Sequence, residues 1–499
     1  MKLSNLIGKI DKVTIAADTN IEVHGVSYDT RTLRAGEIFI AVKGYEHDGH
    51  RYIEEAVRKG AVCILCEETP EVTTSYILVK DSRQALAAAS AAWFRYPASA
   101  LTLVGVTGTN GKTTVTYLTK QVIEKCTGAK VGLIGTNMNM IGSRELPTER
   151  TTPESYEIHE LLRTMVDEGC QYAILEVSSH ALQLHRVHGL EFEVGIFTNL
   201  SPDHQDFHDS MDNYAYIKSR LFKQCHYATI NIDDEYAHIM VASALRPVMT
   251  YSVRDDAADL VGKCIKLRMD RVEFCTLAIG SLNRTVIRIP GMFSVYNALA
   301  AISAAMLLGI DIERAAAVMQ TCNGVKGRAE VVPTGRDFTV LIDYAHTPDA
   351  LGNIIRTVRG FAKGRVITLF GCGGNRDSKK RPLMGEIAAK HSDYIVVTSD
   401  NPRTEEPGAI INDILDGLKN TKTPYQVIEN RREAICWALE NALPGDVLIL
   451  AGKGHETYQD FGKDKTHFDE REVVAEYFGE LSNSEFGIRN SELIRNKVR

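Results

Sequence analysis

The segment that most constrains how this chain folds is residues 101–114, LTLVGVTGTNGKTT. Its apolar first half predicts a short β-strand, a glycine-rich loop follows, and the residues after the loop have the apolar spacing of a helix. Strand, glycine loop and helix in this order form a phosphate cradle, because backbone N–H groups and the positive helix N-terminus both face the anion. Lys112 is expected to reach the β- and γ-phosphates, and the Thr113 hydroxyl to bind Mg²⁺.

The loop departs from the usual phosphate-loop pattern at one position. That pattern has a glycine six residues before the lysine, where this chain has Val106. A turn that merely contains Gly-Lys-Thr is therefore the alternative interpretation. The ordered succession of strand, loop and helix favours a phosphate loop that binds ATP, formed by Gly108, Thr109, Asn110, Gly111, Lys112, Thr113 and Thr114.

Length and composition limit the class of protein. A chain of 499 residues is too long for one hydrophobic core and predicts about three domains. The net charge of −7 argues against a general nucleic-acid-binding surface. The N-terminus has no apolar stretch long enough for a signal peptide, and no run approaches a membrane span. We therefore expect a cytoplasmic monomer without nucleic-acid or membrane partners.

The ten cysteines lack the spacing of a disulfide framework. Cys63 and Cys66 form a C-x-x-C pair, but they lie in the apolar run AVCILC and no second pair follows at zinc-binding spacing. The run predicts a buried strand rather than a metal or redox site. This usage fits a reducing compartment.

Residues 1–97 alternate short predicted strands and helices and form the first expected domain. Two polar loops in it, Asp29-Thr30-Arg31 and residues 44–51, could hold a ligand, although solvated turns are the simpler interpretation. A long alanine-rich helix ends at WFRYP, where Pro97 is a natural boundary.

Residues 98–330 form the second expected domain, an α/β domain with a largely parallel sheet. Ligands of such sheets gather at the carboxyl ends of the strands. Glu176 and His204 stand at two adjacent strand ends, so both could reach a Mg²⁺ ion beside the γ-phosphate. Polar clusters follow the strand candidates of this domain, which besides the first are residues 131–135, 172–177 and 194–200.

Other interpretations of these side chains stay open. Glu176 and His204 could make only hydrogen bonds within loops. A zinc hydrolase built on His204 and His208 is weaker, because histidines four residues apart need a helix and Pro202 stands close by. Lys218 looks like an ordinary helix lysine, and its ammonium group could not bind a metal because it has only donors.

Residues 331–499 form the third expected domain and repeat one theme four times: an apolar strand ends in a loop rich in glycine and charge. The strands are TVLID, VITLF, YIVVT and VLILA, and in a doubly wound sheet their loops share one edge. Arginines and carboxylates occur together there, which suits a zwitterionic ligand. Four unrelated polar loops are the alternative, since loops are polar in general. The residues expected at this edge are Asp343, Arg376, Asp400, Asn401, Arg403, Gly452 and Glu456.

The ordered set of motifs along the chain resembles the Mur ligase family. The motifs are GVTGTNGKTT, TTPE, EVSSHAL, TNLSPDH, DYAHTPDA, GCGGNRDSKKRPLMG, DNPRTEEP and AGKGHE, spread from about residue 25 to about residue 475. The resemblance implies an α/β fold of three domains. These are a small N-terminal UDP-binding domain, a central P-loop ATPase-like domain with a parallel sheet, and a C-terminal Rossmann-like domain for an amino acid.

Within that family, the motifs are similar to those of the ligases that add the third residue of the peptidoglycan stem peptide. The resemblance implies an ATP-dependent amide ligase. It would join meso-2,6-diaminopimelate to the D-Glu γ-carboxylate of UDP-N-acetylmuramoyl-L-Ala-D-Glu through an acyl phosphate, in peptidoglycan precursor synthesis. ATP would be the co-substrate and Mg²⁺ the cofactor. DNPR is the family's recognition loop for diaminopimelate, with Arg403 pairing the distal carboxylate that lysine lacks.

The resemblance also assigns catalytic and nucleotide-binding roles. The catalytic residues would be Lys112, Lys218, Glu176 and His204. The Mg²⁺ ligands would be Thr113, Glu176, His204 and Lys218, the last as an N-carboxylated (carbamate) residue, because a carbamate can accept a metal ion where an ammonium group cannot. Asn297, in a predicted helix over residues 290–309, and Arg328 would bind adenosine, and Asp343 would lie near the nucleotide.

Substrate-binding roles follow from the resemblance in the same way. The UDP-linked substrate would be held by Thr30, Thr151, Thr152, Ser178 and Arg186, and the amino acid by Arg376, Asp400, Asn401, Arg403, Gly452 and Glu456. Two positions depart from the family pattern. Leu184 stands where relatives often have a glutamine that contacts the UDP-linked substrate, and Asn375 replaces an acidic residue common in its loop.

Alternative functions stay open at this point. The same ligation could use L-lysine. A folylpolyglutamate-type ligase would share the ATP site but would not need DNPR or TTPE. A P-loop ATPase switch protein would hydrolyse ATP without an amino-acid requirement. The intact Gly111-Lys112-Thr113 argues against an inactive binding module.

Overall fold

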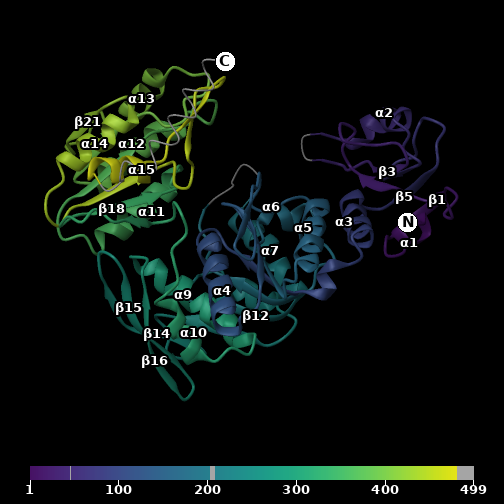
Figure 1. Ribbon diagram of the computed structural model, residues 1–499, viewed down its shortest axis with the longest axis horizontal. Helices are drawn as coiled ribbons and strands as arrows, with labels where there is room; N and C mark the ends of the chain where they lie inside the picture. The colour runs from purple at the N-terminus through teal and green to yellow at the C-terminus, as the bar shows by residue number, and fades with distance from the viewer. Residues whose placement is uncertain (45–46, 203–207, 209, 480–499) are drawn as a thin grey trace. The chain divides into compact units, whose positions relative to one another are not determined.

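The computed structural model describes residues 1–44, 47–202, 208 and 210–479, and the chain forms two compact units (Figure 1). The first unit comprises Met1–Lys263, Thr276–Asn283 and Tyr296–Met319, and the second Cys264–Cys275, Arg284–Val295 and Gln320–Arg499. Among the described residues, every helix is too short or too polar to span a membrane. Four elements contribute residues to both units: β14 (Leu260–Leu267), β15 (Val272–Ala278), β16 (Ser281–Ile287) and α9 (Met292–Leu307).

The first unit begins with a small sheet of five strands in the order β1-β5-β4-β3-β2. Strand β1 is antiparallel to β5, and the other pairs are parallel. The strands are β1 (Lys12–Ala16), β2 (Gly25–Ser27), β3 (Glu37–Ile40), β4 (Cys63–Cys66) and β5 (Tyr76–Val79). The α-helices are α1 (Leu3–Leu6), α2 (Ile53–Arg58) and α3 (Ser82–Trp93), with 3-10 turns at Gly49–Tyr52 and Pro97–Ala100.

Strand β4 of this sheet is buried on both faces. Cys63 and Leu65 pack with residues of α1 and α3, whereas Ile64 and Cys66 pack with residues of α2. In Figure 1, α2 accordingly lies on one side of the purple strands and α1 and α3 on the other. The two cysteines are core residues of a buried strand, as the sequence predicts, and burial raises the pKa of the Cys63 thiol to about 12.

The same unit contains a larger sheet, in which the strands follow the order β13-β12-β11-β6-β10-β7-β8-β9. All neighbours from β13 to β7 are parallel, and β8 and β9 add two antiparallel edge strands. The strands are β6 (Thr102–Thr107), β7 (Val131–Ile134), β8 (Asn139–Ile141), β9 (Arg144–Leu146), β10 (Tyr172–Glu176), β11 (Phe192–Phe197), β12 (Cys225–Asn231) and β13 (Val248–Ser252).

Helices cover this sheet because its strands are apolar on both faces. Ile158, Leu162 and Met165 of α5 pack with Leu103 and Leu175. Helix α4 contacts β6, β7 and β10 and packs against α10. The helices are α4 (Lys112–Thr127), α5 (Ser155–Asp167), α6 (Ser179–Gln183), α7 (Met211–Ser219), α8 (Ala237–Ser243) and α10 (Ile312–Met319), with a 3-10 turn at Arg220–Gln224.

Strand β6 lies between two parallel neighbours, β10 and β11. The register pairs Val106 with Glu176 on one side and Thr107 with Phe197 on the other. The loop after β6 therefore emerges between the ends of β10 and β11. The chain continues from this loop through α4 to β7, on the β10 side, so the loop stands where the sheet order reverses, which is where ligands bind in such sheets.

The second unit is built on a six-stranded sheet in the order β17-β18-β22-β19-β20-β21. Only β17 is antiparallel to its neighbour. The strands are β17 (Glu330–Val332), β18 (Thr339–Asp343), β19 (Val366–Phe370), β20 (Tyr394–Val397), β21 (Tyr425–Val427) and β22 (Val447–Ala451), with a separate antiparallel pair β23 (Tyr458–Asp460) and β24 (Lys465–His467). The four predicted strands are neighbours in this order, so their loops share one edge.

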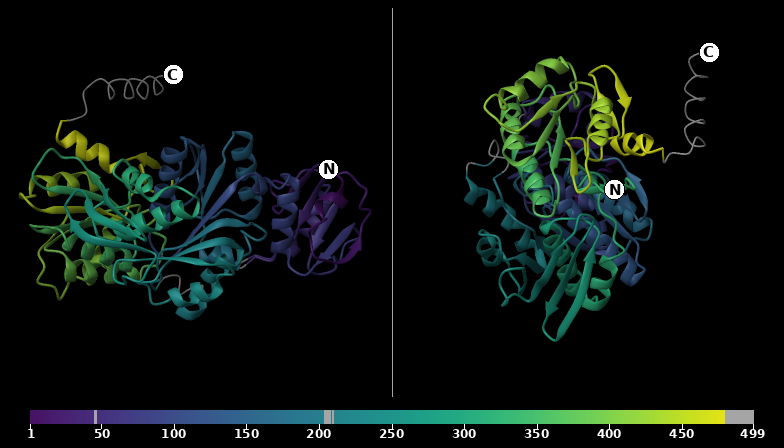
Figure 2. Two further views of the ribbon diagram at one scale, coloured as in Figure 1. Left: turned by 90° about the horizontal axis from the view of Figure 1, so that it is seen from below. Right: turned by 90° about the vertical axis from the view of Figure 1, so that its left-hand side faces the viewer.

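Helices lie on both faces of this sheet (Figures 1 and 2). Ala434 and Ile435 of α14 and Val473 and Val474 of α15 form one core with alternate residues of the strands. Helix α11 contacts β19 and β22, α12 contacts β20, and α12 packs between α11 and α13. The helices are α11 (Pro348–Arg359), α12 (Lys380–His391), α13 (Pro407–Asp416), α14 (Arg431–Glu440) and α15 (Glu470–Tyr477). The three-domain α/β fold predicted from the sequence, with parallel sheets in the central and C-terminal parts, is confirmed.

Candidate active site

The phosphate loop between β6 and α4 depends on glycine at two positions. Gly108 has φ +146° and Gly111 has φ +85°, values that residues with a side chain rarely adopt. A Cβ atom on Gly108 would collide with the Thr198 hydroxyl, and one on Gly111 would lie 2.5 Å from Oδ1 of Asn297. The loop backbone therefore lies directly against the end of β11 and the first turns of α9, and Asn297 stands beside the loop as the sequence predicts.

Residues that follow β11 hold the loop in place. The Thr109 N–H donates to the Asn199 carbonyl at 2.8 Å, and the Asn110 N–H donates to Oδ1 of Asn199 at 3.0 Å. The Thr198 hydroxyl donates to the Asn110 carbonyl at 2.7 Å. The first two residues of the motif TNLSPDH, Thr198 and Asn199, thus hold the phosphate loop by hydrogen bonds. Sequence reasoning did not predict this role.

Two ammonium groups meet at one carbonyl of this loop. Nζ of Lys112 donates to the carbonyls of Gly108, at 2.9 Å, and Thr109, at 2.8 Å. Nζ of Lys218, which lies in α7, also donates to the Gly108 carbonyl at 2.9 Å. The Lys218 side chain is 1% exposed, so it is not the ordinary solvent-facing helix lysine that its sequence context favours. Both lysines therefore have their ammonium groups at the glycine-rich loop.

Glu176 is fully buried at the end of β10 and accepts hydrogen bonds from neutral groups. Its Oε2 accepts the Thr113 hydroxyl at 3.1 Å and the Thr136 hydroxyl at 2.9 Å, and its Oε1 accepts the Thr136 N–H at 2.9 Å. Within the described residues no cation neutralises this carboxylate. A buried anion of this kind beside a threonine hydroxyl fits the oxygen ligands that Mg²⁺ prefers.

The residues predicted to hold the UDP-linked substrate surround the same strand end. The Thr152 hydroxyl donates to the Glu176 carbonyl at 2.7 Å, and the Ser178 N–H donates to the Thr152 hydroxyl at 3.1 Å. Arg186 donates to the Thr152 carbonyl at 3.0 Å, and the Thr151 hydroxyl accepts that of Thr136 at 3.1 Å. These four predicted residues therefore form one cluster with Glu176.

The two histidines of the predicted metal or zinc site are not both described. His204 lies outside the described residues. His208 is buried, and its Nε2 lies 2.9 Å from the Ser179 hydroxyl. In the described part of the chain, no group of three or more histidine, cysteine, aspartate or glutamate side chains could hold a metal ion. A Mg²⁺ site needs no such group, because Mg²⁺ keeps waters and substrate phosphates among its ligands.

A pocket of about 860 Å³ in the first unit brings the Thr30 loop near the TTPE segment. Its lining includes Asp29 and Arg31 on one side and Arg150, Pro153 and Glu154 on the other. Thr30 itself is buried, and its carbonyl accepts Nζ of Lys59 at 2.7 Å. The pocket is polar and large enough for a nucleotide, which favours ligand binding over the simpler interpretation of a solvated turn.

In the second unit, Asp343 and Arg328 lie together at the end of β18. The Asp343 carboxylate accepts the N–H groups of Ala329, at 2.7 Å, and Ala345, at 2.9 Å. Burial raises the pKa of Asp343, although the nearby Arg328 guanidinium opposes this. Arg328 also lies over the Tyr344 ring, 5.1 Å from its centre. A cation stacked on an aromatic ring beside a carboxylate can hold a purine and its ribose.

The loops after β20 and β22 form a polar cluster around a buried lysine. Nζ of Lys453 lies 3.0 Å from Oδ1 of Asn401, 3.3 Å from Oε2 of Glu456 and 3.6 Å from Oδ1 of Asp400. Nδ2 of Asn401 donates to Oε2 of Glu456 at 2.8 Å. Gly452 has φ +112°, and a Cβ there would lie 2.6 Å from Oδ2 of Asp400. Four predicted residues thus cluster on Lys453, which was not predicted.

The loops after β19 and β20 are tied together by Asn375. Its Oδ1 accepts the N–H of Thr404 at 3.1 Å and the hydroxyl of Thr404 at 2.8 Å. Nη1 of Arg403 donates to the Gly374 carbonyl at 2.7 Å, and Arg376 of the same loop is exposed. The two arginines predicted to meet a carboxylate therefore belong to loops that are joined, and the departure at Asn375 has a structural role.

A buried ion pair, Arg431 with Glu470, lies beside the loops after β20 and β22. The Arg431 and Glu470 side chains, 0% and 1% exposed, lie 2.8 Å apart. Arg431 also donates to the carbonyls of Ser399, at 3.3 Å, and Ala451, at 2.8 Å, which directly precede the loops that carry Asp400 and Gly452. Burial raises the pKa of Glu470, and the Arg431 guanidinium opposes that rise.

Sequence reasoning missed Thr136, Lys453 and Arg431. Lys453 lies within the quoted motif AGKGHE, so its place in a polar loop after a strand was a usable signal. No sequence motif marks Thr136 or Arg431. Their partners, Glu176 for Thr136 and the Ser399 and Ala451 carbonyls for Arg431, are brought near them only by the order of the strands.

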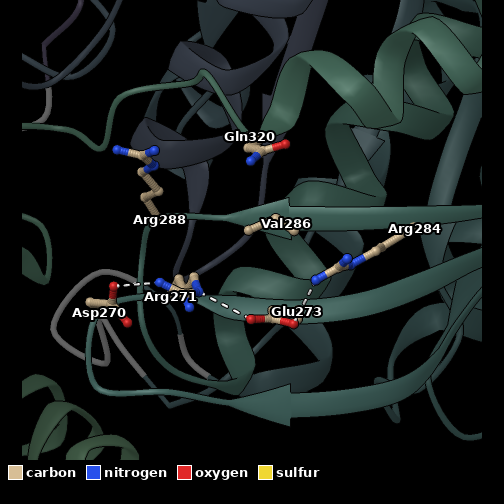
Figure 3. Close-up of a pocket in the computed structure, with 7 residues that line it drawn as sticks. All are labelled: Asp270, Arg271, Glu273, Arg284, Val286, Arg288 and Gln320. Carbon is tan, nitrogen blue, oxygen red and sulfur yellow. Dashed lines mark hydrogen bonds and ion pairs between the residues drawn. The ribbon is translucent and has the colours of Figure 1, made fainter.

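A second pocket, of about 330 Å³, lies in the second unit among β15 and β16 residues (Figure 3). Glu273 pairs with Arg271 at 3.1 Å and with Arg284 at 3.0 Å, and Asp270 pairs with Arg271 at 2.9 Å. Figure 3 shows these side chains linked to one another along the pocket wall. The lining carries three arginines and two carboxylates, so one positive charge of the pocket is left without a carboxylate of its own.

Three family models match the chain in succession. A Mur ligase family catalytic domain matches residues 22–103, a Mur ligase middle domain matches residues 106–305, and a Mur ligase glutamate ligase domain matches residues 327–454. A UDP-N-acetylmuramoyl-L-alanyl-D-glutamate--2,6-diaminopimelate ligase from Caldanaerobacter subterraneus subsp. tengcongensis is 48% identical, covering 96% of this chain and 99% of the relative. A ligase of the same name from Clostridioides difficile is 43% identical, covering 96% of this chain and 100% of the relative.

Solved structures agree with these matches. A structure of a UDP-N-acetylmuramoyl-L-alanyl-D-glutamate--2,6-diaminopimelate ligase superposes with a TM-score of 0.72 at 30% identity, covering 96% of this chain and 99% of the other. A Mycobacterium tuberculosis folylpolyglutamate synthase, crystallised with ADP and AMPPCP, has a TM-score of 0.60 at 15% identity, covering 73% of this chain and 91% of the other. The second likeness concerns the fold alone.

Proposed function

Because this chain belongs to the Mur ligase family, we propose that it is the ATP-dependent ligase that adds meso-2,6-diaminopimelate to the D-Glu γ-carboxylate of UDP-N-acetylmuramoyl-L-Ala-D-Glu. The product is a UDP-linked tripeptide used in peptidoglycan synthesis. The observation that carries this proposal is the near full-length similarity to ligases of that name, together with a phosphate loop and a second polar pocket on the same chain.

ATP is held by the phosphate loop, residues 108–114. The loop N–H groups and the N-terminus of α4 face the phosphates, and Lys112 moves from the loop carbonyls to the β- and γ-oxygens. Asn297 contributes to the adenosine site because it stands beside Gly111. The resemblance also assigns adenosine binding to Arg328 and a place near the nucleotide to Asp343, and within the second unit Arg328 lies over the Tyr344 ring.

Thr113, Glu176, His204 and a modified Lys218 would hold Mg²⁺. The donor chemistry supports this assignment for Thr113 and Glu176, whose oxygens are 3.1 Å apart. Mg²⁺, when bound, supplies positive charge against the phosphates. Lys218 acts as a carbamate, which changes a buried cation into an anion able to bind the metal. Its burial against Tyr214, with Nζ 4.6 Å from the ring centre, shields such a modification from water.

The UDP-linked substrate lies in the polar pocket between the Thr30 loop and the TTPE segment, with Thr151, Thr152, Ser178 and Arg186 around its peptide end. The cluster of these residues on the Glu176 strand end supports this placement, because the reacting γ-carboxylate must meet the γ-phosphate. The amino acid binds to Asp400, Asn401, Gly452 and Glu456, and its distal carboxylate pairs with Arg403 and Arg376.

The reaction takes two steps. An oxygen of the substrate γ-carboxylate attacks the γ-phosphorus of ATP, the bond to the bridging oxygen breaks, and ADP leaves. Lys112 stabilises the charge on the transferred group. The neutral amine of diaminopimelate then attacks the acyl carbon, phosphate leaves, and the amine gives up a proton as the amide forms. Thr152 and Arg186 orient the UDP-linked substrate, and the polar side chains of the C-terminal domain hold the rest of the amino acid so that its neutral amine faces the acyl carbon.

We also propose that the three domains extend over residues 1–97, 98–330 and 331–499. The lengths matched by the three family models support these boundaries. We propose that the chain acts as a monomer.

Phosphate release from ATP tests the proposal, with Mg²⁺ and UDP-N-acetylmuramoyl-L-Ala-D-Glu present and with meso-diaminopimelate, L-lysine or no amino acid added. Release and tripeptide formation with diaminopimelate alone are expected. The same result with L-lysine instead would overturn the role given to Arg403. Release that ignores every substrate would identify an ATPase switch instead.

A further inference from the structure

The inference concerns Lys453, a buried lysine at the centre of the amino-acid pocket. It rests on the proposed function, because it concerns how that pocket recognises its amino acid. The side chain is 0% exposed, and a buried ammonium group is tolerated only where anions and acceptors surround it. Lys453 has three such neighbours: Asp400, Asn401 and Glu456.

Lys453 and the backbone N–H of Asp460 together determine which way the Asn401 amide points. Oδ1 of Asn401 accepts Nζ of Lys453 at 3.0 Å and the N–H of Asp460 at 3.0 Å. With the oxygen held by two donors, the amide nitrogen must face the other way, and it donates to Oε2 of Glu456 at 2.8 Å. A flipped amide would place two N–H groups against Lys453 and Asp460, so the arrangement has one orientation.

The two donors to Glu456 occupy only one of its oxygens. Oε2 accepts Asn401 and lies 3.3 Å from Nζ of Lys453. Among the described residues, none donates to Oε1 of Glu456. A carboxylate held by one oxygen presents the other to a ligand in a fixed direction, which is a prearranged acceptor for an ammonium group.

The charge of the buried cluster leads to the same ligand. Around Lys453 itself, apart from Arg403 and Arg376 on the neighbouring loops, the carboxylates of Asp400 and Glu456 outnumber the one ammonium group by one. One ammonium group on the ligand would complete the balance.

We propose that Lys453 is a positioning residue for the amino-acid substrate. It orients Asn401 and Glu456 so that Oε1 of Glu456 meets the ammonium group of diaminopimelate that does not react. It does not touch the reacting atoms. Loss of Lys453 should therefore raise the KM for diaminopimelate while the transfer of phosphate to the UDP-linked substrate continues.

The test uses the full chain and the variant Lys453→Met, which keeps the length of the side chain and removes its charge. The KM for diaminopimelate should rise about 10- to 50-fold, because Asn401 and Glu456 lose a buried partner. The KM values for ATP and the UDP-linked substrate should change less than twofold. Acyl phosphate formation, measured without amino acid by trapping with hydroxylamine as a hydroxamate, should stay near the wild-type rate. Lys390→Met, the same change at an exposed position on α12, is the control.

Lys453→Arg is the second variant and separates charge from shape. It keeps a positive charge at this position, so its KM for diaminopimelate should lie closer to the wild-type value than that of Lys453→Met. Equal losses in the two variants would overturn the proposal, since packing alone would then explain them. An unchanged KM in Lys453→Met would overturn it as well.

The failure of this proposal can be told apart from the failure of the proposed function. A wild-type chain that forms no hydroxamate and no tripeptide overturns the function, and the inference falls with it. A wild-type chain that forms both, while Lys453→Met keeps the wild-type KM, overturns the inference alone.

Discussion

Glu176 in the central domain and Glu456 in the C-terminal domain both stand near the end of a parallel strand, but their surroundings differ. Glu176 accepts three hydrogen bonds from neutral groups, the Thr113 hydroxyl and the Thr136 N–H and hydroxyl. Glu456 lies beside a buried ammonium group, that of Lys453. The described residues place no cation beside the first carboxylate, which under our proposal meets Mg²⁺ that arrives with the nucleotide. Lys453 balances part of the negative charge of the second carboxylate. Under our proposal the other oxygen of Glu456 accepts the ammonium group of the amino acid.

The largest expected effect would come from removing the charge of Glu176. In Glu176→Gln the side chain keeps its shape, but its amide group can no longer attract Mg²⁺. We expect kcat for ligation to fall about a thousandfold and the Mg²⁺ concentration for half-maximal rate to rise. ADP formation measured across a Mg²⁺ titration checks this. Glu145→Gln, at an exposed position of β9, should behave as wild type, and a Glu176→Gln variant with normal Mg²⁺ dependence would remove one side of the comparison.

The second prediction concerns the buried ion pair of Arg431 and Glu470 in the C-terminal domain. Arg431→Met leaves the carboxylate of Glu470 buried without its partner, and unfolding free energy should fall by about 3 kcal/mol or more. Urea denaturation followed by tryptophan fluorescence measures it. Arg432→Met removes a partly exposed pair with Glu476 and should cost less than about 1 kcal/mol. If Arg431→Met cost no more than Arg432→Met, the buried charges of this region would not depend on one another.

The third prediction concerns His159, a buried histidine of the central domain. Burial lowers the pKa of His159 from 6.5 to about 4. The folded state therefore resists protonation, whereas the unfolded state takes up a proton as pH falls below 6.5. Stability should thus be lost as pH falls from 6.5 towards 4, by about 2 to 3 kcal/mol from this residue.

His159→Phe should remove that part of the loss. The measurement is the difference in unfolding free energy between pH 7 and pH 4.5, compared between wild type and variant. His238→Phe, at an exposed position, should leave the difference unchanged. An equal pH dependence in wild type and His159→Phe would show that His159 is protonated as readily when folded as when unfolded.

The smallest expected effect concerns the link between the loops after β19 and β20. Asn375 has φ +53°, so glycine is the replacement that removes its side chain without straining the backbone. Asn375→Gly loses the two hydrogen bonds from Thr404, and the KM for diaminopimelate should rise about threefold. Asn375→Asp keeps an acceptor oxygen and should change it little. A larger effect in the aspartate variant than in the glycine variant would contradict this role.

The sequence predicted four strands in each parallel sheet, because an apolar strand that ends in a polar loop is a local pattern, but it missed β12, β13 and β21. It predicted TVLID, VITLF and VLILA to the residue and placed their loops at one edge. It could not predict that Lys453 would lie among Asp400, Asn401 and Glu456, because that depends on the strand order β22-β19-β20. It also could not predict the burial of Lys218, because one helix turn decides whether a side chain faces the loop or the solvent. Whether Lys218 is buried could be read only from the folded structure. The role of His204 rests on the family resemblance.

One consequence of the Arg431 guanidinium concerns motion. Strands β20 and β22 are separated by β19, so no ladder of backbone hydrogen bonds joins them directly. Arg431 holds the carbonyls of Ser399 and Ala451, the last residues before the loops that carry Asp400 and Gly452. The two loops should therefore open together, and their amide hydrogens should exchange with solvent at the same opening free energy. Under the proposed function, diaminopimelate would then bind to two loops that open and close as one unit.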